Sequence, residues 1–85
     1  SLTPAVMVVA VPSGHRFAGL ASVSASDLDG EDVVAFAHST ELRTVIDPLL
    51  AEAGARVRIA FESSEIDTIR GLVGVGLGIA IIPEP

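Results

Sequence analysis

The stretch ESSEIDTIRGLVGVGLGIAIIP, residues 62–83, decides the fold because it combines a polar loop, an amphipathic run, four glycines and an apolar end. Ile66, Ile69 and Val73 recur at the spacing of one helical face, which predicts a helix in the middle of the stretch. The final segment LGIAIIP, residues 77–83, is apolar almost throughout, which is typical of a buried strand. The order loop, helix, strand follows from these patterns.

The four glycines of this stretch do not form a dinucleotide-binding loop. That motif needs glycines directly after a strand, where a helix begins, so that the helix N-terminus meets the pyrophosphate. Here Gly71 and Gly74 are expected inside or at the end of a helix, and all four glycines, with Gly76 and Gly78, precede a strand. Gly76 is expected to end the helix as its C′ residue. The group is expected to allow close packing of the helix on a sheet and a tight turn into the strand.

Two serines raise a different possibility at the start of the same helix. Ser63 and Ser64 lie where the predicted strand RVRIAFE, residues 56–62, passes into the helix. Free N–H groups and a partial positive charge at a helix N-terminus can hold a carboxylate or phosphate. Ser64, with Asp67 three residues later, also resembles a capping box, and a serine cap needs no ligand. Both interpretations stay open on the sequence alone.

The composition excludes several classes of function. The 85 residues suffice for one small domain, and the hydrophobic fraction of 49% excludes a disordered chain. With 4% aromatic residues, stacking platforms for single-stranded nucleic acid are not available. The net charge of −6 argues against contact with nucleic acid or an anionic membrane. Without cysteine there is no disulfide scaffold and no thiol nucleophile.

The rest of the chain supplies further strands and a second helix. Buried strands are predicted at residues 5–11 and 33–37, and a short helical turn at residues 24–30, SASDLDG, capped by Ser24 or Ser26 and closed by Gly30. Apolar residues from Leu42 to Ala53 recur at i, i+3, i+4, i+7, i+8 and i+11, which predicts an amphipathic helix. We expect it to begin near Ser39 or Thr40, to bend at Pro48 and to end at Gly54.

The second half of the chain therefore alternates strand and helix, which predicts a parallel sheet with right-handed crossovers. Ligands of open α/β sheets bind outside the carboxyl ends of the strands. Two loops meet that condition, HST at residues 38–40 and ESS at residues 62–64, and both lead into a helix N-terminus. The sequence thus predicts an anion pocket whose candidate ligand-binding residues are His38, Ser39, Thr40, Ser63 and Ser64.

Three stretches of the chain resemble the effector-binding domain of LysR-type transcriptional regulators. They are VVAVPSGHRFAG at residues 8–19, SASDLDGEDVVAF at residues 24–36 and RIAFESSEIDTIRGLVGVGLGIAIIP at residues 58–83, of which the last is the most specific. In the first, HRFA stands where the family usually has HPLA, with Arg16 in place of Pro and Phe17 in place of Leu. The likeness covers essentially the whole chain.

The resemblance implies an α/β fold, a three-layer Rossmann-like lobe of the type II periplasmic-binding-protein fold. Residues 1–85 would form a single lobe, the second of two, with hinge crossings near residues 2–4 and 83–85. It further implies a mixed sheet of about four strands, in the order 56–62, 33–37, 77–82, 5–11, with the last strand antiparallel to the others. The hinge and the HST and ESS loops would then surround one cleft. Residues 12–15 would lie at the opposite edge, so His15 and His38 would share no metal site.

The function implied is that of a non-catalytic sensor lobe in the cytoplasm. It would bind a small, anionic effector in the cleft between lobes and so modulate a DNA-bound oligomer, with no cofactor and no metal. DNA would be contacted only through a separate N-terminal domain, and no membrane would be involved. Self-association to a dimer or tetramer would use exposed apolar surface on helix 40–53 and strand 56–62. A lobe of an extracytoplasmic solute-binding protein of a transporter is the alternative. Catalysis is disfavoured because no GxSxG nucleophile motif is present.

Overall fold

Four strands, two α-helices and a short 3-10 helix make up residues 6–84, the part of the chain that the computed structural model describes. In chain order they are β1 (Met7–Ala10), η1 (Ala25–Leu28), β2 (Asp32–Phe36), α1 (Glu41–Glu52), β3 (Arg58–Ser63), α2 (Ile66–Gly74) and β4 (Ala80–Pro83). Every predicted element is present, with bounds that differ by a few residues. The predicted hinge crossing at residues 2–4 and the end of the second crossing at residue 85 lie outside the described residues.

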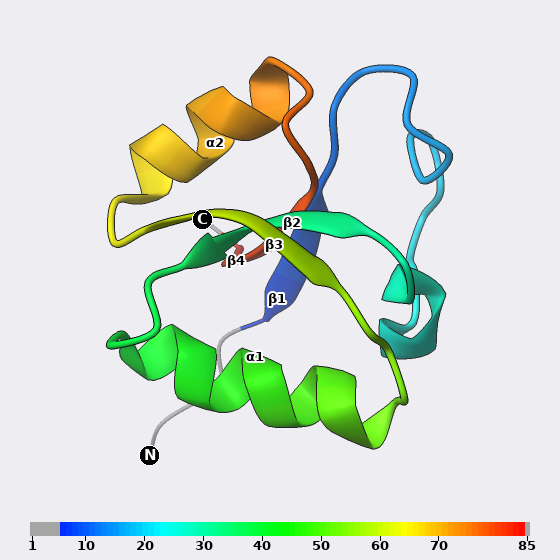
Figure 1. Ribbon diagram of the computed structural model, residues 1–85. Coiled ribbons are helices and arrows are strands. Elements are labelled where there is room, and N and C mark those ends of the chain that lie inside the picture. The colour runs from blue at the N-terminus through cyan, green and yellow to red at the C-terminus, as the bar shows by residue number, and fades with distance from the viewer. Residues whose placement is uncertain (1–5, 85) are drawn as a thin grey trace.

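The strands form one mixed layer in the predicted order. β2 pairs with β3 in parallel, and β1 pairs with β4 antiparallel. A parallel bridge between Val33 and Ile79 joins the two pairs. There the Val34 N–H donates to the Ile79 carbonyl at 2.8 Å, and the Ile79 N–H donates to the Asp32 carbonyl at 2.9 Å. The order is therefore β3-β2-β4-β1, and the single antiparallel strand is β1, as predicted (Figure 1).

Gly78 makes the approach of β4 to β2 possible. A Cβ atom at this position would lie 2.6 Å from the carbonyl oxygen of Asp32 and 2.9 Å from its carbon. Contacts that short are not tolerated, so only glycine lets the two strands meet here. Gly71 and Gly74 differ, because a Cβ atom on either would meet nothing within 4 Å. The prediction that these two glycines allow close packing of the helix on the sheet is wrong, since both face away from it.

Gly76 ends α2 as predicted. It has φ +88°, a conformation that side chains other than glycine rarely adopt. Its N–H donates to the Val73 carbonyl at 2.9 Å, and the Leu77 N–H donates to the Leu72 carbonyl at 3.1 Å. This pair of bonds is the Schellman motif, which satisfies the last carbonyls of the helix and turns the chain toward β4.

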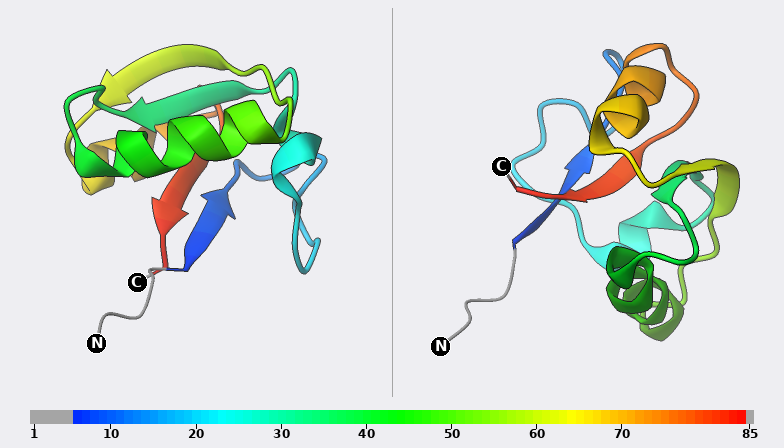
Figure 2. Two further views of the ribbon diagram at one scale, coloured as in Figure 1. Left: turned by 90° about the horizontal axis from the view of Figure 1, so that it is seen from below. Right: turned by 90° about the vertical axis from the view of Figure 1, so that its left-hand side faces the viewer.

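The two helices cover opposite faces of the sheet and so complete the predicted three layers (Figures 1 and 2). Ile46 and Leu50 bury the inner face of α1, and Ile69 and Val73 bury that of α2. The sheet contributes buried residues from β2 and from the segment around β4: Val33, Val34, Ala35, Phe36, Ile79, Ala80, Ile81 and Ile82. Because β2 and β4 are covered on both faces, they read as unbroken apolar runs in the sequence.

Candidate functional site

The HST and ESS loops lie side by side beyond the carboxyl ends of β2 and β3 (Figure 1). The Ala37 N–H donates to the Ser63 carbonyl at 2.9 Å, which continues the ladder of the two strands by one bond. The His38 N–H donates to Oε1 of Glu62 at 3.3 Å. The structure therefore brings together all five predicted site residues, which lie 23 or more positions apart in two groups along the chain only because the strands are parallel.

Thr40 organises the HST loop. It is the N-cap of α1, as predicted, but its side chain makes no capping hydrogen bond to the helix. Instead the Thr40 hydroxyl donates to the Ala37 carbonyl at 2.8 Å, and the Thr40 N–H donates to the same oxygen at 2.9 Å. His38 and Ser39 are exposed on the turn that these bonds close. The lone pairs of the Thr40 hydroxyl stay available to a donor.

Ser63, rather than Ser64, organises the ESS loop. Its Oγ accepts a hydrogen bond from the Glu65 N–H at 3.1 Å, two residues ahead. α2 begins at Ile66 with Glu65 as N-cap, so the predicted capping box of Ser64 and Asp67 is wrong. The physical reason is that a serine turn, in which the side chain bonds to a nearby backbone N–H, competes with capping and delays the helix. Ser64 is left exposed.

Two helix N-termini without side-chain caps thus adjoin one sheet edge. Neither Thr40 nor Glu65 gives its helix a side-chain cap hydrogen bond. The first N–H groups of each helix have no partner within the helix, and both dipoles present their positive ends. Acidic residues occupy both first turns, Glu41 in α1 and Asp67 in α2, where they complement those dipoles. The edge can donate hydrogen bonds to the acceptor groups of a ligand, both from backbone N–H groups and from serine hydroxyls.

Arg43 underlies this edge, and the sequence reasoning missed it. Its side chain is buried, with a residue exposure of 8%. Nη1 donates to the Phe36 carbonyl and to Oε2 of Glu62, both at 3.0 Å, and Nε donates to Oδ1 of Asp47 at 2.9 Å. A signal was present in the sequence, because Arg43 precedes the buried Ile46 and Leu50 by three and seven residues on one helical face.

The charges of this group reinforce one another. The hydrogen bond from Arg43 lowers the pKa of Glu62 below its ordinary value. The hydrogen bond to Asp47, with that to Glu62, raises the pKa of Arg43 against the opposing effect of burial. Both groups therefore carry their charges at neutral pH, and the ion pair between them persists there.

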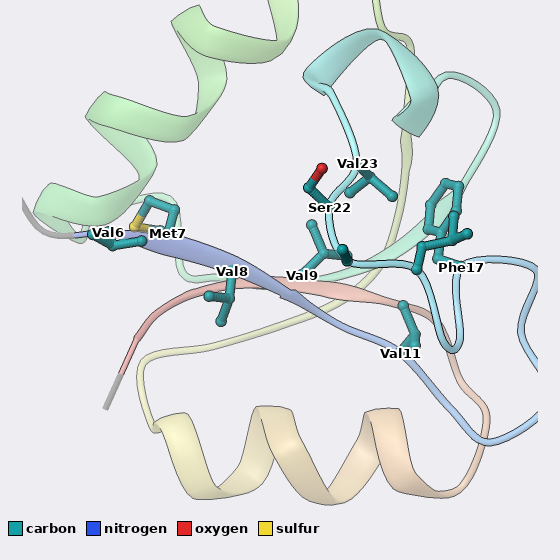
Figure 3. Close-up of a pocket in the computed structure, with 10 residues that line it drawn as sticks. Val6, Met7, Val8, Val9, Val11, Phe17, Ser22 and Val23 are labelled. Atoms are coloured by element: carbon teal, nitrogen blue, oxygen red, sulfur yellow. The ribbon is translucent and has the colours of Figure 1, made fainter.

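A cavity of about 360 Å³ lies elsewhere, along β1 (Figure 3). Its walls are side chains of β1, of Phe17 and of the segment that follows Phe17. Figure 3 shows Val9, Val11, Val23 and the Phe17 ring around it. None of the five candidate residues lines it. The candidate loops form an open edge of the molecule instead, with His38, Ser39 and Ser64 exposed.

His15 lies at the other end of the sheet, as predicted. Its Nε2 is 2.7 Å from Oε1 of Glu31, directly before β2, whereas His38 follows β2. Within residues 6–84, no group of three or more His, Cys, Asp or Glu side chains is placed to hold a metal ion. No helix of the same part of the chain is long and apolar enough to cross a membrane.

The model of the LysR substrate binding domain family matches residues 1–85. The chain belongs to this family. Among curated relatives, the uncharacterized HTH-type transcriptional regulator YybE of Bacillus subtilis is 33% identical over 78 residues, which are 92% of this chain and 27% of that protein. The transcriptional dual regulator GltC of the same organism is 31% identical over 74 residues, 87% of this chain and 25% of that protein. The chain therefore spans about a quarter of the curated relatives it matches.

Solved LysR structures have the same fold. The effector binding domain of QuiR in complex with shikimate superposes with a TM-score of 0.89 at 32% identity, over 98% of this chain and 40% of that chain. HinK, a LysR family transcriptional regulator from Pseudomonas aeruginosa, superposes with a TM-score of 0.85 at 36% identity, over 98% of this chain and 28% of that chain. The predicted family and fold class are confirmed, and the transporter alternative finds no support in these relatives.

Proposed function

We propose that this LysR effector-binding domain forms one half of a cleft that holds a small anionic effector. The carrying observation is the pairing of the HST and ESS loops at one sheet edge, where two helices begin without side-chain caps. Such an edge offers N–H donors and positive dipole ends to a carboxylate or phosphate. QuiR, with the same fold, was solved in complex with shikimate, a small organic anion, which supports this class of ligand.

The proposed ligand contacts come from both loops. His38 and Ser39 contribute exposed side chains. The Thr40 hydroxyl donates its proton to the Ala37 carbonyl, so it can only accept a hydrogen bond from a donor on the effector, such as a hydroxyl. Ser63 and Ser64 contribute the second wall, together with the first N–H groups of α2. The other half of the cleft is a first lobe, and residues 1–85 are the second lobe. The solved relatives, of which this chain covers 28% to 40%, leave ample length for such a lobe.

Closure of the two lobes on the effector is the proposed output. An effector shifts a conformational equilibrium only by its difference in affinity for the open and closed states, and contacts from both lobes supply that difference. DNA is contacted by a separate N-terminal domain, in line with the HTH-type description of YybE. The intact protein works in the cytoplasm as a regulator and not as an enzyme.

Self-association uses the outer surface of α1 and β3. Val45 and Leu49 on α1 are exposed, as expected for this helix, and so are Ile59 and Phe61 on β3. Four large apolar side chains on two neighbouring elements are typical of an interaction surface. We assign this surface to contact between copies of the regulator, as a dimer or tetramer.

The experiment adds a negative charge at the proposed site of the intact regulator. Shikimate and other small carboxylates and phosphates are first tested for stabilisation of the protein against heat, and a hit is then titrated by calorimetry. Ser64→Asp places a carboxylate at the exposed end of the ESS loop, where like-charge repulsion should weaken anion binding about tenfold or more. Ser13→Asp, on the exposed turn at the opposite end of the sheet, is the matched control and should leave affinity unchanged. Equal affinity of both variants and the wild type would exclude these loops as the anion site.

A further inference from the structure

A single carboxylate connects the two candidate loops. Oε1 of Glu62 accepts the His38 N–H at 3.3 Å, and Oε2 accepts Nη1 of Arg43 at 3.0 Å. The next residue, Ser63, accepts the Ala37 N–H through its carbonyl at 2.9 Å. Glu62 belongs to the strand that carries the ESS loop, and His38 to the HST loop, so the spacing of the loops depends on where this carboxylate is held.

Arg43 holds that carboxylate from below. It reaches three elements, since it donates to Glu62 of β3, to the carbonyl of Phe36 at the end of β2, and to Asp47 of its own helix. Its side chain is 9% exposed and that of Glu62 is 41% exposed, so the cation is fixed inside the protein while the carboxylate reaches the surface. Burial of the guanidinium restricts its motion, and its planar donors define where each acceptor must lie.

The same two elements carry the apolar surface proposed for self-association. Val45 and Leu49 lie on α1, and Phe61 directly precedes Glu62 on β3. The Arg43–Glu62 pair therefore joins the two elements that carry that surface. One residue of the pair, Arg43, belongs to α1, and the other, Glu62, belongs to β3. These two elements carry the association surface and also adjoin the HST and ESS loops.

We propose that Arg43 and Glu62 are positioning residues: their ion pair sets the geometry of the HST loop against the ESS loop. The proposal rests on the proposed function for its consequence, because the geometry matters to affinity only if the loops bind the effector. The role assigned to the pair is to hold the two loops in place and not to bind the effector. Its contribution is to hold the exposed His38 and Ser39 and the adjoining N-terminus of α1 in place before the ligand arrives, which spares the ordering cost at binding.

The chain offers a matched control pair. Arg58 and Asp32 also join β3 to β2, through two hydrogen bonds of 2.8 Å and 2.7 Å. They stand at the opposite end of the same strands, where β3 begins. Loss of this pair removes a tie between the same strands without touching either candidate loop, so it separates a general loss of sheet stability from a loss of loop position.

The experiment is two double-mutant cycles in the intact regulator, one of Arg43→Met and Glu62→Ala, the other of Arg58→Met and Asp32→Ala. The first readout needs no effector: amide hydrogen exchange of the HST loop. We expect exchange at His38 and Ser39 to rise about three- to tenfold in each variant of the first cycle, with no further rise in the double variant, and to stay unchanged in the second cycle. Glu62→Gln, which keeps a carbonyl for the His38 N–H, should give a smaller rise.

The second readout is affinity for the anion found in the screen above, measured well below the melting temperature of each variant. We expect a loss of about three- to tenfold in the double variant of the first cycle, which leaves the net charge unchanged, and none in the double variant of the second. Glu62→Ala alone also removes a negative charge beside the proposed anion site, so its affinity is not compared with that of the wild type. Unchanged exchange at the HST loop in the first cycle, or an equal rise in both cycles, would overturn the positioning role whatever the affinity. Faster exchange with unchanged affinity would overturn the link to the effector. A wild type that binds no small anion would instead count against the proposed function, while the exchange data would still decide whether the pair positions the loop.

Discussion

The two ends of the sheet hold similar side chains in opposite conditions. At the end where β2 and β4 begin, both ring nitrogens of His15 are engaged, Nε2 with Glu31 at 2.7 Å and Nδ1 with the Phe17 N–H at 3.1 Å. Arg16 also bonds Glu31, and its guanidinium lies 4.2 Å from the centre of the Phe17 ring. At the end where β2 and β3 finish, the side chain of His38 is exposed and, within the described residues, makes no hydrogen bond.

This contrast separates polar residues that the fold engages from those that we propose to bind the effector. A buried or half-buried polar group must find a partner, and at the first end each partner is internal. At the second end the side chains of His38, Ser39 and Ser64 are exposed and can meet other molecules. The type of residue does not distinguish the two ends, since each has a histidine, an arginine and a glutamate. The arginine and the glutamate are bonded internally at both ends, and the histidine side chain distinguishes them, since that of His15 is bonded within the fold and that of His38 is exposed.

We call the end of the sheet where β2 and β4 begin the closed end, and the end where β2 and β3 finish the open end. The largest effect is expected at the closed end, from a substitution of Gly78. Gly78→Ala should destabilise the domain by about 1–3 kcal/mol or more, because the new Cβ atom would overlap the Asp32 carbonyl and force β4 away from β2. Gly71→Ala is the same change seven residues earlier, in the exposed part of α2, and should stabilise by up to about 1 kcal/mol through helix propensity. Urea unfolding of both variants measures the two free energies. If Gly71→Ala were also destabilising, a glycine would be required within α2 as well as next to β4.

Glu31 tests how the closed end responds to pH. Burial opposes its ionisation most strongly, but hydrogen bonds from His15 and Arg16 outweigh it and lower the pKa of this carboxyl below its ordinary value. Since the pKa is lower in the folded state, the stabilisation is present above the unfolded pKa of about 4.3 and is lost as pH falls through the folded value. Glu31→Gln should therefore cost about 1 kcal/mol at pH 7 and should weaken the dependence of stability on pH below about 4.

Thermal unfolding between pH 7 and pH 3 measures this effect, with Glu52→Gln on the exposed surface of α1 as the control. The control should follow the wild type over the whole range. If Glu31→Gln also followed the wild type, the bonds to His15 and Arg16 would contribute nothing to stability, and the closed end would depend on Gly78 and the buried core alone.

The sequence predicted the fold better than the site. Element order follows from hydrophobic periodicity, and the position of the antiparallel strand followed from the family resemblance, because a pattern of apolar residues does not say which strands are neighbours. The start of α2 was wrong because a serine turn at Ser63 and a cap at Ser64 use similar local bonds and differ little in free energy. Arg43 was missed because its partner Glu62 lies 19 residues away, and periodicity contains no information on such a pair.

The smallest expected effects lie at the open end, and they decide whether its hydroxyls bind the effector. Ser64→Ala should change stability by less than about 0.5 kcal/mol, since Ser64 is exposed and caps no helix. Ser63→Ala and Thr40→Ala each remove one hydrogen bond, to the Glu65 N–H and the Ala37 carbonyl, and should cost about 0.5–1 kcal/mol.

If these hydroxyls also contact the effector, affinity in the intact regulator falls by a similar amount in the variants concerned, after correction for the folded fraction. DNA affinity without effector should not change, because the proposed cleft is separate from the DNA-binding domain. One outcome would show that none of the three hydroxyls binds the effector. It is lower stability with unchanged affinity in Ser63→Ala and Thr40→Ala, together with no effect of Ser64→Ala. The anion would then have to be held by the backbone N–H groups of α1 and α2, which proline substitutions in the first turn of either helix would remove one at a time.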